Sequence, residues 1–376
     1  MAIVSGRKCS NYEYKAVFSA LDKCLEDIGG LSKYIKKGER VLIKPNIVAP
    51  MIKEKHATTH PLVVEVLYDM LKKIGAIPII GESSGFMEIG DTAYNMSVAG
   101  YNNDKLKGVL HPFEEKGFED IRLKKSKRLK NIQAARLLFE VDKIIFVPKL
   151  KSHMITKYTG AIKNCYGCVG LTTRRKGHTY SDYYALSECI NDIYFYVNPD
   201  LCIMDAIVSM QGTGPTMGMP IKTGFLFASS DGIAMDKICS EMIGIKNLYL
   251  VEDAINRGKG GKNIKYVGDD LEFFCFDKPS LMTNFFYFKL PFIHRMIFRY
   301  TKIIPLIKEG NKNSKLASIC PYGAISLNGI NYKKCKLCFM CYYHYKKKGI
   351  TKKQSLFARI ASVITKKSRL SNRRMH

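Results

Sequence analysis

Residues 143–153 read KIIFVPKLKSH, an apolar run that ends at a proline and is followed by two lysines and a histidine. The run IIFV at 144–147 has counterparts in LCIM at 201–204 and FLFA at 225–228. A strand covered on both faces is apolar throughout, whereas a strand with one wet face alternates apolar and polar residues. These runs therefore predict a mainly parallel sheet with helices on both faces.

The chain on either side of this stretch alternates short apolar runs with helical patterns, which is typical of an α/β fold. We expect strands at 40–44, 77–80, 143–147, 201–207 and 224–228, with helices at 14–28, 61–74, 183–196 and 233–243. Ser230 or Asp231 is the expected N-cap of the last helix. We assign residues 1–280 to one α/β domain.

Four cysteines near the C-terminus have the spacing of iron–sulfur ligands. Cys335, Cys338 and Cys341 form a C-x2-C-x2-C run, and Cys320 lies upstream, directly before Pro321. In bacterial ferredoxins a run of this kind supplies three thiolates to a cubane, and a distant Cys-Pro supplies the fourth. We expect one [4Fe–4S] cluster in a small ferredoxin-like α+β module at 311–349. Zinc is the alternative, although zinc sites usually pair two C-x2-C knuckles.

A second cluster is not expected, because the positions that would hold its ligands are Gly310, Asn313, Leu316 and Tyr345. A pair elsewhere, Cys165-x2-Cys168, fits either a redox pair, half of a metal site with His153 or His178, or two small core thiols.

Polar residues directly follow the predicted strands, where ligands bind in open α/β sheets. Glu82, His153 and Asp205 form a candidate set for proton transfer. Lysines and amides offer point charges and hydrogen bonds to phosphate or carboxylate groups. The candidate substrate-binding residues are Lys44, Asn46, Lys149, Lys151, Lys163 and Asn164. The glycine-rich turns match neither a Walker A nor a G-x-G-x-x-G pattern, so no nucleotide site is predicted.

The 376 residues carry 60 Lys+Arg against 33 Asp+Glu, a net charge of +27, which indicates an anionic partner. The candidates are an anionic small-molecule substrate, an acidic redox partner protein and anionic lipid headgroups; nucleic acid is disfavoured because recognition motifs and tryptophan are missing. We expect a cytoplasmic protein, because no secretory signal and no apolar stretch of roughly 18 residues is present.

Two segments flank the cysteine module. Residues 281–310 are aromatic and basic and are broken by prolines, which fits a connecting helix pair or a membrane-surface contact. In the tail, 350–376, apolar residues at 356, 357, 360, 363 and 364 form one stripe of a basic amphipathic helix. Such a helix fits an anionic inner membrane face, a partner's groove or its own domain.

A series of short motifs resembles domain of unknown function 362, a family often fused to a ferredoxin module. The motifs are Lys44-Pro-Asn46, Thr59-His60-Pro61, Gly81-Glu82-Ser-Ser-Gly85, Lys149-Leu-Lys151-Ser-His153, Lys163-Asn164-x2-Gly167-Cys168 and Gly212-x-Gly214-Pro215. The resemblance implies one α/β domain coupled to a [4Fe–4S] module, with a shared site at Lys44, Asn46, Lys149, Lys151, His153, Lys163 and Asn164. It brings no substrate, and the single cluster departs from members that carry two.

The function expected from the sequence is therefore an iron–sulfur oxidoreductase or electron-transfer protein. In the first case the cluster exchanges electrons with a site in the cationic crevice. The alternatives are a pure electron carrier that docks an acidic partner and a binding protein whose cluster is only structural.

Overall fold

A computed structural model describes residues 1–85, 89–180, 182–279, 300, 302–308, 315–326, 329–356 and 358–359. Its centre is a ten-stranded sheet. The main path of the sheet runs β12 (Ile264–Gly268), β1 (Ala2–Lys8), β11 (Met219–Ser229), β10 (Leu201–Gln211), β7 (Lys143–Val147), β2 (Arg40–Pro45), β3 (Ile77–Glu82), β4 (Leu110–Pro112). β8 (Lys149–His153) pairs with β10 and with β9 (Lys157–Thr159).

Most strand pairs in this sheet are parallel, as the apolar runs predicted. β11 is the exception among the long strands, since it pairs antiparallel with both β1 and β10. The parallel block β10-β7-β2-β3-β4 brings the carboxyl ends of these strands to one edge. That edge is where ligands bind in α/β folds.

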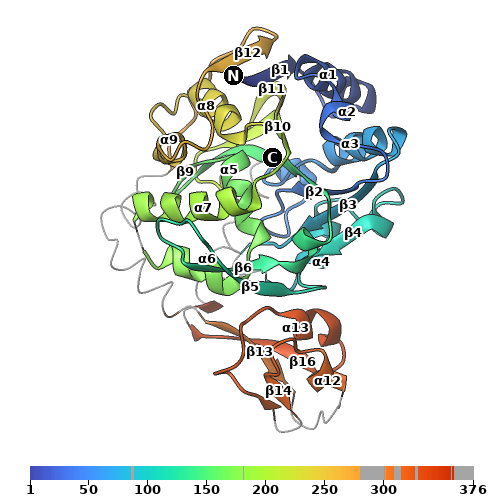
Figure 1. Ribbon diagram of the computed structural model, residues 1–376, viewed down its shortest axis with the longest axis vertical. Coiled ribbons are helices and arrows are strands. Elements are labelled where there is room, and N and C mark those ends of the chain that lie inside the picture. The colour runs from blue at the N-terminus through green and yellow to red at the C-terminus, as the bar shows by residue number, and fades with distance from the viewer. Residues whose placement is uncertain are drawn as a thin grey trace.

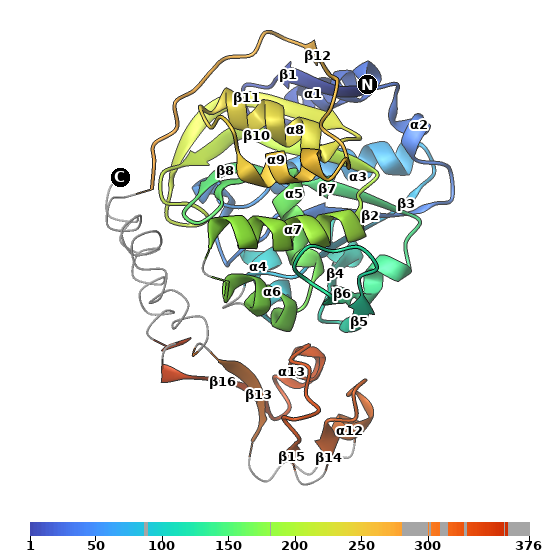
Figure 2. The same cartoon turned by 60° about the vertical axis from the view of Figure 1, so that its left-hand side comes forward.

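Two layers of helices cover the sheet, one on each face. The side chains of successive residues in a strand pack against opposite layers. In β2, Leu42 packs into the core beneath α7 (Tyr183–Val197), α8 (Gly232–Met242) and α9 (Tyr249–Asn256). Its neighbours Val41 and Ile43 pack against α1 (Tyr14–Asp27) and α3 (Pro61–Lys73) on the other face. Figures 1 and 2 show these two helical layers on either side of the sheet. The alternation confirms that the continuous apolar runs are strands buried on both faces.

Asp231 is the N-cap of α8, where its carboxylate accepts hydrogen bonds from the backbone N–H groups of Ile233 and Ala234. Of the two capping residues considered from the sequence, the structure uses the aspartate. Its acceptor satisfies two N–H groups that have no partner inside the helix.

The cysteine-rich region lies below the α/β domain in Figures 1 and 2, next to β5 (Phe118–Arg122), β6 (Asn131–Ala135) and α4 (Thr92–Val98). Its described elements are β13 (Ile303–Ile307), α12 (Lys315–Ser318), β14 (Ile325–Ser326), β15 (Gly329–Ile330), α13 (Met340–Tyr345) and β16 (Ile350–Gln354). Antiparallel pairing of β13 with β16 adds 303–307 and 350–354 to the predicted module. Most of the predicted connector and of the predicted tail helix falls outside the described residues.

Among the described residues, no helix combines the length and the apolar character needed to cross a bilayer.

Candidate functional site

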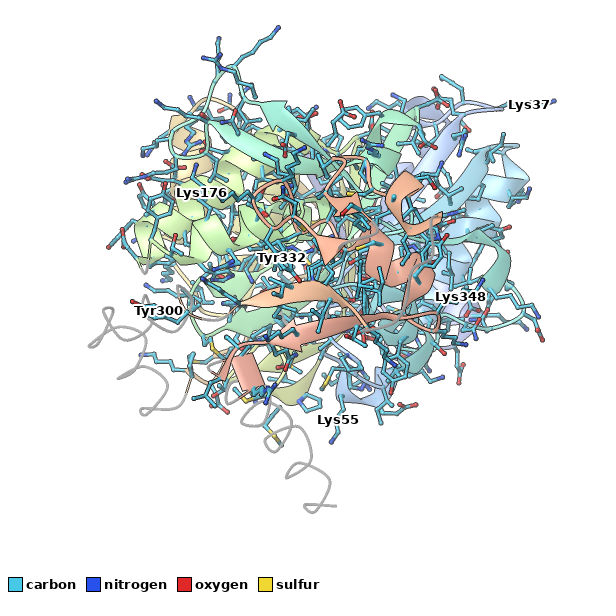
Figure 3. The ribbon with its side chains drawn as sticks, turned by 90° about the horizontal axis from the view of Figure 1, so that it is seen from below. Lys37, Lys55, Lys176, Tyr300, Tyr332 and Lys348 are labelled. Atoms are coloured by element: carbon cyan, nitrogen blue, oxygen red, sulfur yellow. The ribbon has the colours of Figure 1, made fainter. Side chains whose placement is uncertain are left out.

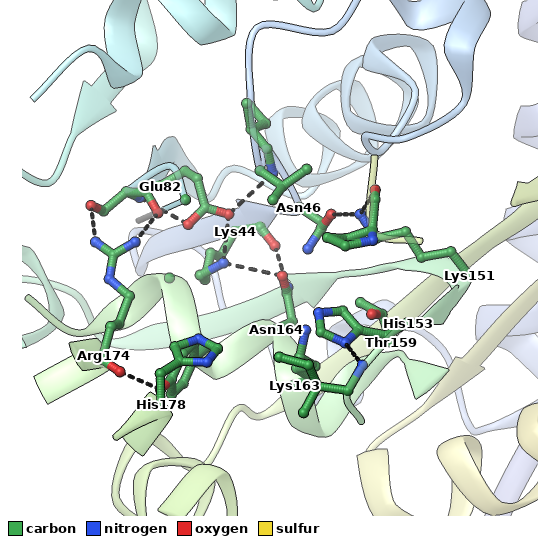
Figure 4. A pocket seen from close by; sticks show the side chains of 18 of the residues that line it. Lys44, Asn46, Glu82, Lys151, His153, Thr159, Lys163, Asn164, Arg174 and His178 are labelled. Atoms are coloured by element: carbon green, nitrogen blue, oxygen red, sulfur yellow. Dashed lines mark hydrogen bonds and ion pairs between the residues drawn. The ribbon is translucent and has the colours of Figure 1, made fainter. Parts of the chain in front are cut away.

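A pocket of about 230 Å³ opens at the carboxyl edge of the parallel strands. Its walls come from the ends of β2, β3 and β8, from the short helix α5 (Ala161–Asn164) and from α6 (Leu171–His178). Figure 4 shows the polar side chains converging on it. Of the residues predicted from the sequence, the pocket contains Lys44, Asn46, Glu82, Lys151, His153, Lys163 and Asn164.

Lys44 and Glu82 form a buried ion pair in the wall of this pocket. The Lys44 Nζ lies 2.7 Å from Glu82 Oε2, and it also donates to Asn164 Oδ1 and to the carbonyl oxygen of Pro45, both at 3.1 Å. Burial raises the pKa of Glu82, and the charge of Lys44 opposes this effect. Because all three protons of the ammonium group have acceptors, Lys44 is committed to the structure of the wall.

Gly167 allows this pair to form. A Cβ at Gly167 would lie 1.9 Å from Glu82 Oε1 and 2.9 Å from Lys44 Nζ. Only a residue without a side chain fits there, which explains the glycine inside the Cys165-x2-Cys168 turn.

Lys151 is fully buried and has neutral partners only. Its Nζ donates to Asn46 Oδ1 at 2.8 Å and to the backbone carbonyl oxygens of Ala57 and Pro215 at 2.6 and 3.4 Å. Burial lowers its pKa far below the usual range, and the nearby charge of Lys163 adds to the effect. Among the described residues, no carboxylate forms an ion pair with this lysine.

His153 is held in one tautomer by its own loop. Its Nδ1 accepts hydrogen bonds from the backbone N–H groups of Ile155 and Thr156, at 3.1 and 3.2 Å. Burial lowers its pKa far below the ordinary value, with the charge of Lys163 as the next contribution. A neutral ring whose Nδ1 accepts must carry its proton on Nε2. The side chain is therefore a hydrogen-bond donor to whatever lies beside Nε2.

Lys163 differs from the other lysines of the pocket, because its amine has neither a hydrogen bond nor an ion pair within the described part of the chain. Burial lowers its pKa to about 7. Helix α5, which carries Lys163, is anchored at its first turn. There the Asp236 carboxylate accepts hydrogen bonds from the backbone N–H groups of Ala161 and Ile162, at 2.7 and 2.8 Å. An unpaired amine on an anchored backbone faces the pocket as a result.

Arg174, on α6, is a pocket residue that the sequence did not single out. Its guanidinium donates to the carbonyl oxygens of Ser83 and Ser84 and to Ser83 Oγ, and its Nε is buried without a partner. In the sequence it belongs to the run Arg174-Arg175-Lys176, which has the appearance of a solvated helix face. With Lys151 and Lys163 it gives the pocket three basic groups that form no ion pair with a carboxylate in the part of the chain that the structure describes.

Lys149 and Asp205 lie outside this pocket. Lys149 Nζ is 2.9 Å from Asp205 Oδ2 and 2.7 Å from the Tyr12 hydroxyl. Asp205 also accepts from the Tyr12 hydroxyl and from the backbone N–H of His60, both at 2.9 Å. The ring of His60 stacks on Tyr12 with centroids 3.8 Å apart. The structure thus separates Asp205 from Glu82 and His153, the residues grouped with it as a proton-transfer set.

Cys165 and Cys168 are fully buried in the core beneath α7. Burial raises the pKa of both thiols, that of Cys168 to about 12. Their surroundings match those of small core side chains.

The four predicted cluster ligands, Cys320, Cys335, Cys338 and Cys341, line one small pocket in the C-terminal region. All four are free thiols. Burial raises the pKa of Cys338 to about 11, and a backbone N–H of Met340 opposes this effect. The backbone N–H of Ala324 donates to the sulfur of Cys320 at 3.3 Å.

The loop that carries the three closely spaced cysteines is bent around this pocket. Leu337 and Phe339 have φ of 54° and 59°, in the left-handed region that few non-glycine residues adopt. Apolar groups from Ile325, Ile330 and Phe339 complete the lining. Four thiols, backbone donors aimed at sulfur and an apolar shell fit the requirements of an iron–sulfur cluster. Among the described residues, no three His, Cys, Asp or Glu side chains converge as ligands of one metal ion.

Helix α6 connects the two sites. At its start, Thr172 Oγ1 donates to the carbonyl oxygen of Lys336, which lies between Cys335 and Cys338, at 3.0 Å. Leu171 packs in one cluster with Phe339. Arg174 enters the cationic pocket one turn later.

The C-terminal region is also attached through Asp91, which accepts from the Tyr342 hydroxyl at 3.0 Å and pairs with Lys352 and Lys346. Figure 3 views this region from below and shows lysines projecting outward from both parts of the chain, among them Lys37, Lys176 and Lys348. The excess positive charge is therefore spread over the exterior as well as concentrated in the pocket.

Comparison with known proteins finds a match to the family model "Domain of unknown function (DUF362)" over residues 41–241. A thylakoid-associated protein of Synechocystis sp. is 27% identical over 248 residues, which cover 64% of this chain and 74% of that protein.

Among solved structures, the lactate racemase apoprotein of Thermoanaerobacterium thermosaccharolyticum matches with a TM-score of 0.47 and 16% identity. The alignment covers 65% of this chain and 58% of the racemase chain. A Thermotoga maritima protein matches with a TM-score of 0.38 and 15% identity, over 68% of this chain and 60% of its own.

Proposed function

Because the chain belongs to the DUF362 family, whose name assigns no activity, we propose a function from the two sites themselves: an iron–sulfur redox enzyme that binds an anionic small molecule. One [4Fe–4S] cluster is held by Cys320, Cys335, Cys338 and Cys341. The anion occupies the cationic pocket at the edge of the sheet. The observation that carries the proposal is the contact of a single helix, α6, with both sites.

The pocket supports the anion half of this proposal through its charge balance. Glu82 is neutralised by Lys44 at 2.7 Å, so it offers no repulsion to an incoming carboxylate or phosphate. Lys151, Lys163 and Arg174 have no carboxylate partner within the described residues. Burying cations without counter-charges is costly, and a bound anion removes that cost. His153 Nε2–H adds a neutral donor to the anion or to a neighbouring oxygen.

The cysteine pocket supports the redox half. A cubane cluster takes one thiolate at each iron, so its ligands need not converge on one point. When bound, it supplies or accepts one electron at a time. The protein's part is to exclude water with the apolar lining and to lower the negative charge on the sulfurs through backbone N–H donors, which tunes the potential.

Anaerobic purification followed by iron and sulfide analysis tests the cluster directly. We expect about four irons and about four sulfides per chain, and a paramagnetic signal that appears when dithionite reduces the protein. Cys335→Ser should lose most of the iron. Cys275→Ser is the matched control, because Cys275 is exposed and lies outside the four-cysteine pocket, and it should keep the full complement.

The alternatives predict other results. Zinc, or no metal, would overturn the redox half. A cluster that dithionite does not reduce, and whose loss unfolds the C-terminal region, would indicate a structural role. A pure electron carrier predicts binding of an acidic partner protein that weakens steeply with salt, with no small anion in the pocket.

Peripheral contact of the basic tail that follows β16, residues 355–376, with an anionic membrane surface is a second part of the proposal. It is motivated by the tail's sequence and by the thylakoid association of the Synechocystis relative. Co-sedimentation with vesicles containing anionic lipid, compared for the full chain and for a chain ending at Gln354, tests it. Equal sedimentation of the two would contradict it.

A further inference from the structure

One amine in the cationic pocket has no hydrogen-bond acceptor among the described residues. Lys44 has three acceptors, and so does Lys151. Lys163 has none within the described residues, and its side chain lines the same pocket. An ammonium group in such a place would be stabilised by acceptors, and the described part of the chain supplies none. The arrangement suits an amine that spends much of its time uncharged.

We propose that Lys163 is a nucleophile that forms an imine with the carbonyl group of an anionic oxo acid bound in the pocket. This inference rests on the anion pocket of the proposed function and names the chemical class of its ligand. Arg174, whose Nε–H has no partner among the described residues, donates to the carboxylate, and His153 Nε2–H donates a hydrogen bond to the carbonyl oxygen. The ligand is thereby oriented with its carbonyl carbon toward the amine.

The protonation state supports this geometry. An amine attacks only when it is unprotonated, and burial lowers the pKa of Lys163 to about 7. Roughly half of the molecules then carry a free amine at neutral pH, against about one in 2,500 for an ordinary exposed lysine. The neutral His153 ring polarises the carbonyl group without adding another full charge beside the amine.

The step is balanced without an oxidant or a reductant. The lone pair of Lys163 Nζ forms a bond to the carbonyl carbon, and the carbon–oxygen π bond breaks. The amine gives up two protons in all. They leave with the oxygen of the carbinolamine as one molecule of water, and a C=N bond remains. Oxidation states do not change, and water is the only product released.

Anaerobic incubation of the full chain with glyoxylate and cyanoborohydride at pH 7 tests the inference. Glyoxylate is the smallest oxo acid, and cyanoborohydride transfers hydride to an imine and fixes it as a carboxymethyl amine. Peptide mapping by mass spectrometry then measures labelling at every lysine of the same sample. We expect Lys163 to react on the order of 1,000-fold faster than exposed lysines such as Lys36 and Lys107, because of its larger unprotonated fraction.

Oxalate, which has the carboxylates but no electrophilic carbonyl, should slow labelling at Lys163 and leave the exposed lysines unaffected. Lys163→Arg keeps a cation in the pocket and should remove the fast labelling while oxalate binding by calorimetry persists. Both results support the inference. Because the key comparison is made within the wild-type chain, a variant that folds poorly does not weaken the test.

Two results would overturn the inference, and they have different meanings. If oxalate binds but Lys163 is labelled no faster than exposed lysines, imine formation is wrong and the anion pocket stands. If oxalate does not bind and labelling is uniform, both the imine and the anion half of the proposed function fail. The iron and sulfide analysis is independent of either result.

Discussion

Lys44 and Lys163 line the same pocket, but they differ in their hydrogen-bond and ion-pair partners. Lys44 is matched to the carboxylate of Glu82 and to two further oxygen atoms. Lys163 has no such partner in the described structure, and burial lowers its pKa to about 7. The pocket thus contains one cation that is part of its wall and another that is available to a ligand.

This difference shows how a strongly basic chain can contain a specific anion site. A charge that is paired internally contributes little to ligand binding, even where it belongs to a motif. The unpaired charges contribute, because their desolvation has already occurred during folding.

The largest effect on stability is expected from removing Lys44, the lysine that is paired with Glu82. Lys44→Met leaves the Glu82 carboxylate buried and uncompensated, so we expect a loss of about 3–5 kcal/mol in the free energy of unfolding. Urea unfolding followed by circular dichroism measures it. Lys163→Met removes an uncompensated cation and should leave the stability within about 0.5 kcal/mol of wild type or raise it.

The double variant Lys44→Met/Glu82→Gln sharpens this test, because it removes both charges and leaves a neutral amide. It should be substantially more stable than Lys44→Met alone, since the two residues are directly coupled. Equal destabilisation of the single and the double variant would show that the ion pair is not the source of the loss. A large loss from Lys163→Met would erase the distinction between the two lysines.

The strands of this site were predictable, because their signal is local. Strand 143–147 was expected and coincides with β7, and the expected strand 40–44 differs from β2 by one residue. A run of buried β-branched residues determines its own conformation through burial on two faces. The pocket residues Lys44, Glu82 and His153 were found because they lie at strand ends.

The grouping of Lys149 with Lys151 was not predictable in detail. The two are separated by one residue on β8, which suggests a shared face, yet Lys149 lies opposite Asp205 and Lys151 opposite Met210. This irregular register directs the two lysines to different partners. Register irregularities depend on the neighbouring strand, and no pattern within 149–153 reports them. Arg174 was missed for a similar reason: α6 is placed by tertiary packing.

A smaller effect is expected on ligand affinity. Lys163→Met should weaken oxalate binding about 10-fold, equivalent to about 1.4 kcal/mol, because one of three unpaired basic groups is lost. Lys149→Arg is the control, since Lys149 lies outside the pocket, and it should keep wild-type affinity. Isothermal calorimetry at constant ionic strength measures both. An unchanged affinity in Lys163→Met would place the anion elsewhere.

The smallest effect is a proton taken up when the anion binds. Burial holds the pKa of free Lys163 at about 7, and a carboxylate beside the amine must raise that pKa. Near pH 8 most free molecules are unprotonated at Lys163, so oxalate binding should draw in up to one proton. At pH 5 the amine is already charged, and the uptake from this residue should vanish.

Calorimetry of oxalate binding in two buffers with different ionisation heats counts these protons. Protons are taken up, not released, because the pKa of Lys163 rises on binding. A base whose pKa is higher in the complex binds protons at pH values between its free and its bound pKa. Lys163→Arg should abolish the uptake at pH 8 and still bind oxalate, because arginine stays charged throughout. Uptake that persists in this variant would assign the proton to another group and leave Lys163 as an ordinary ammonium ion, equivalent in charge to Lys44.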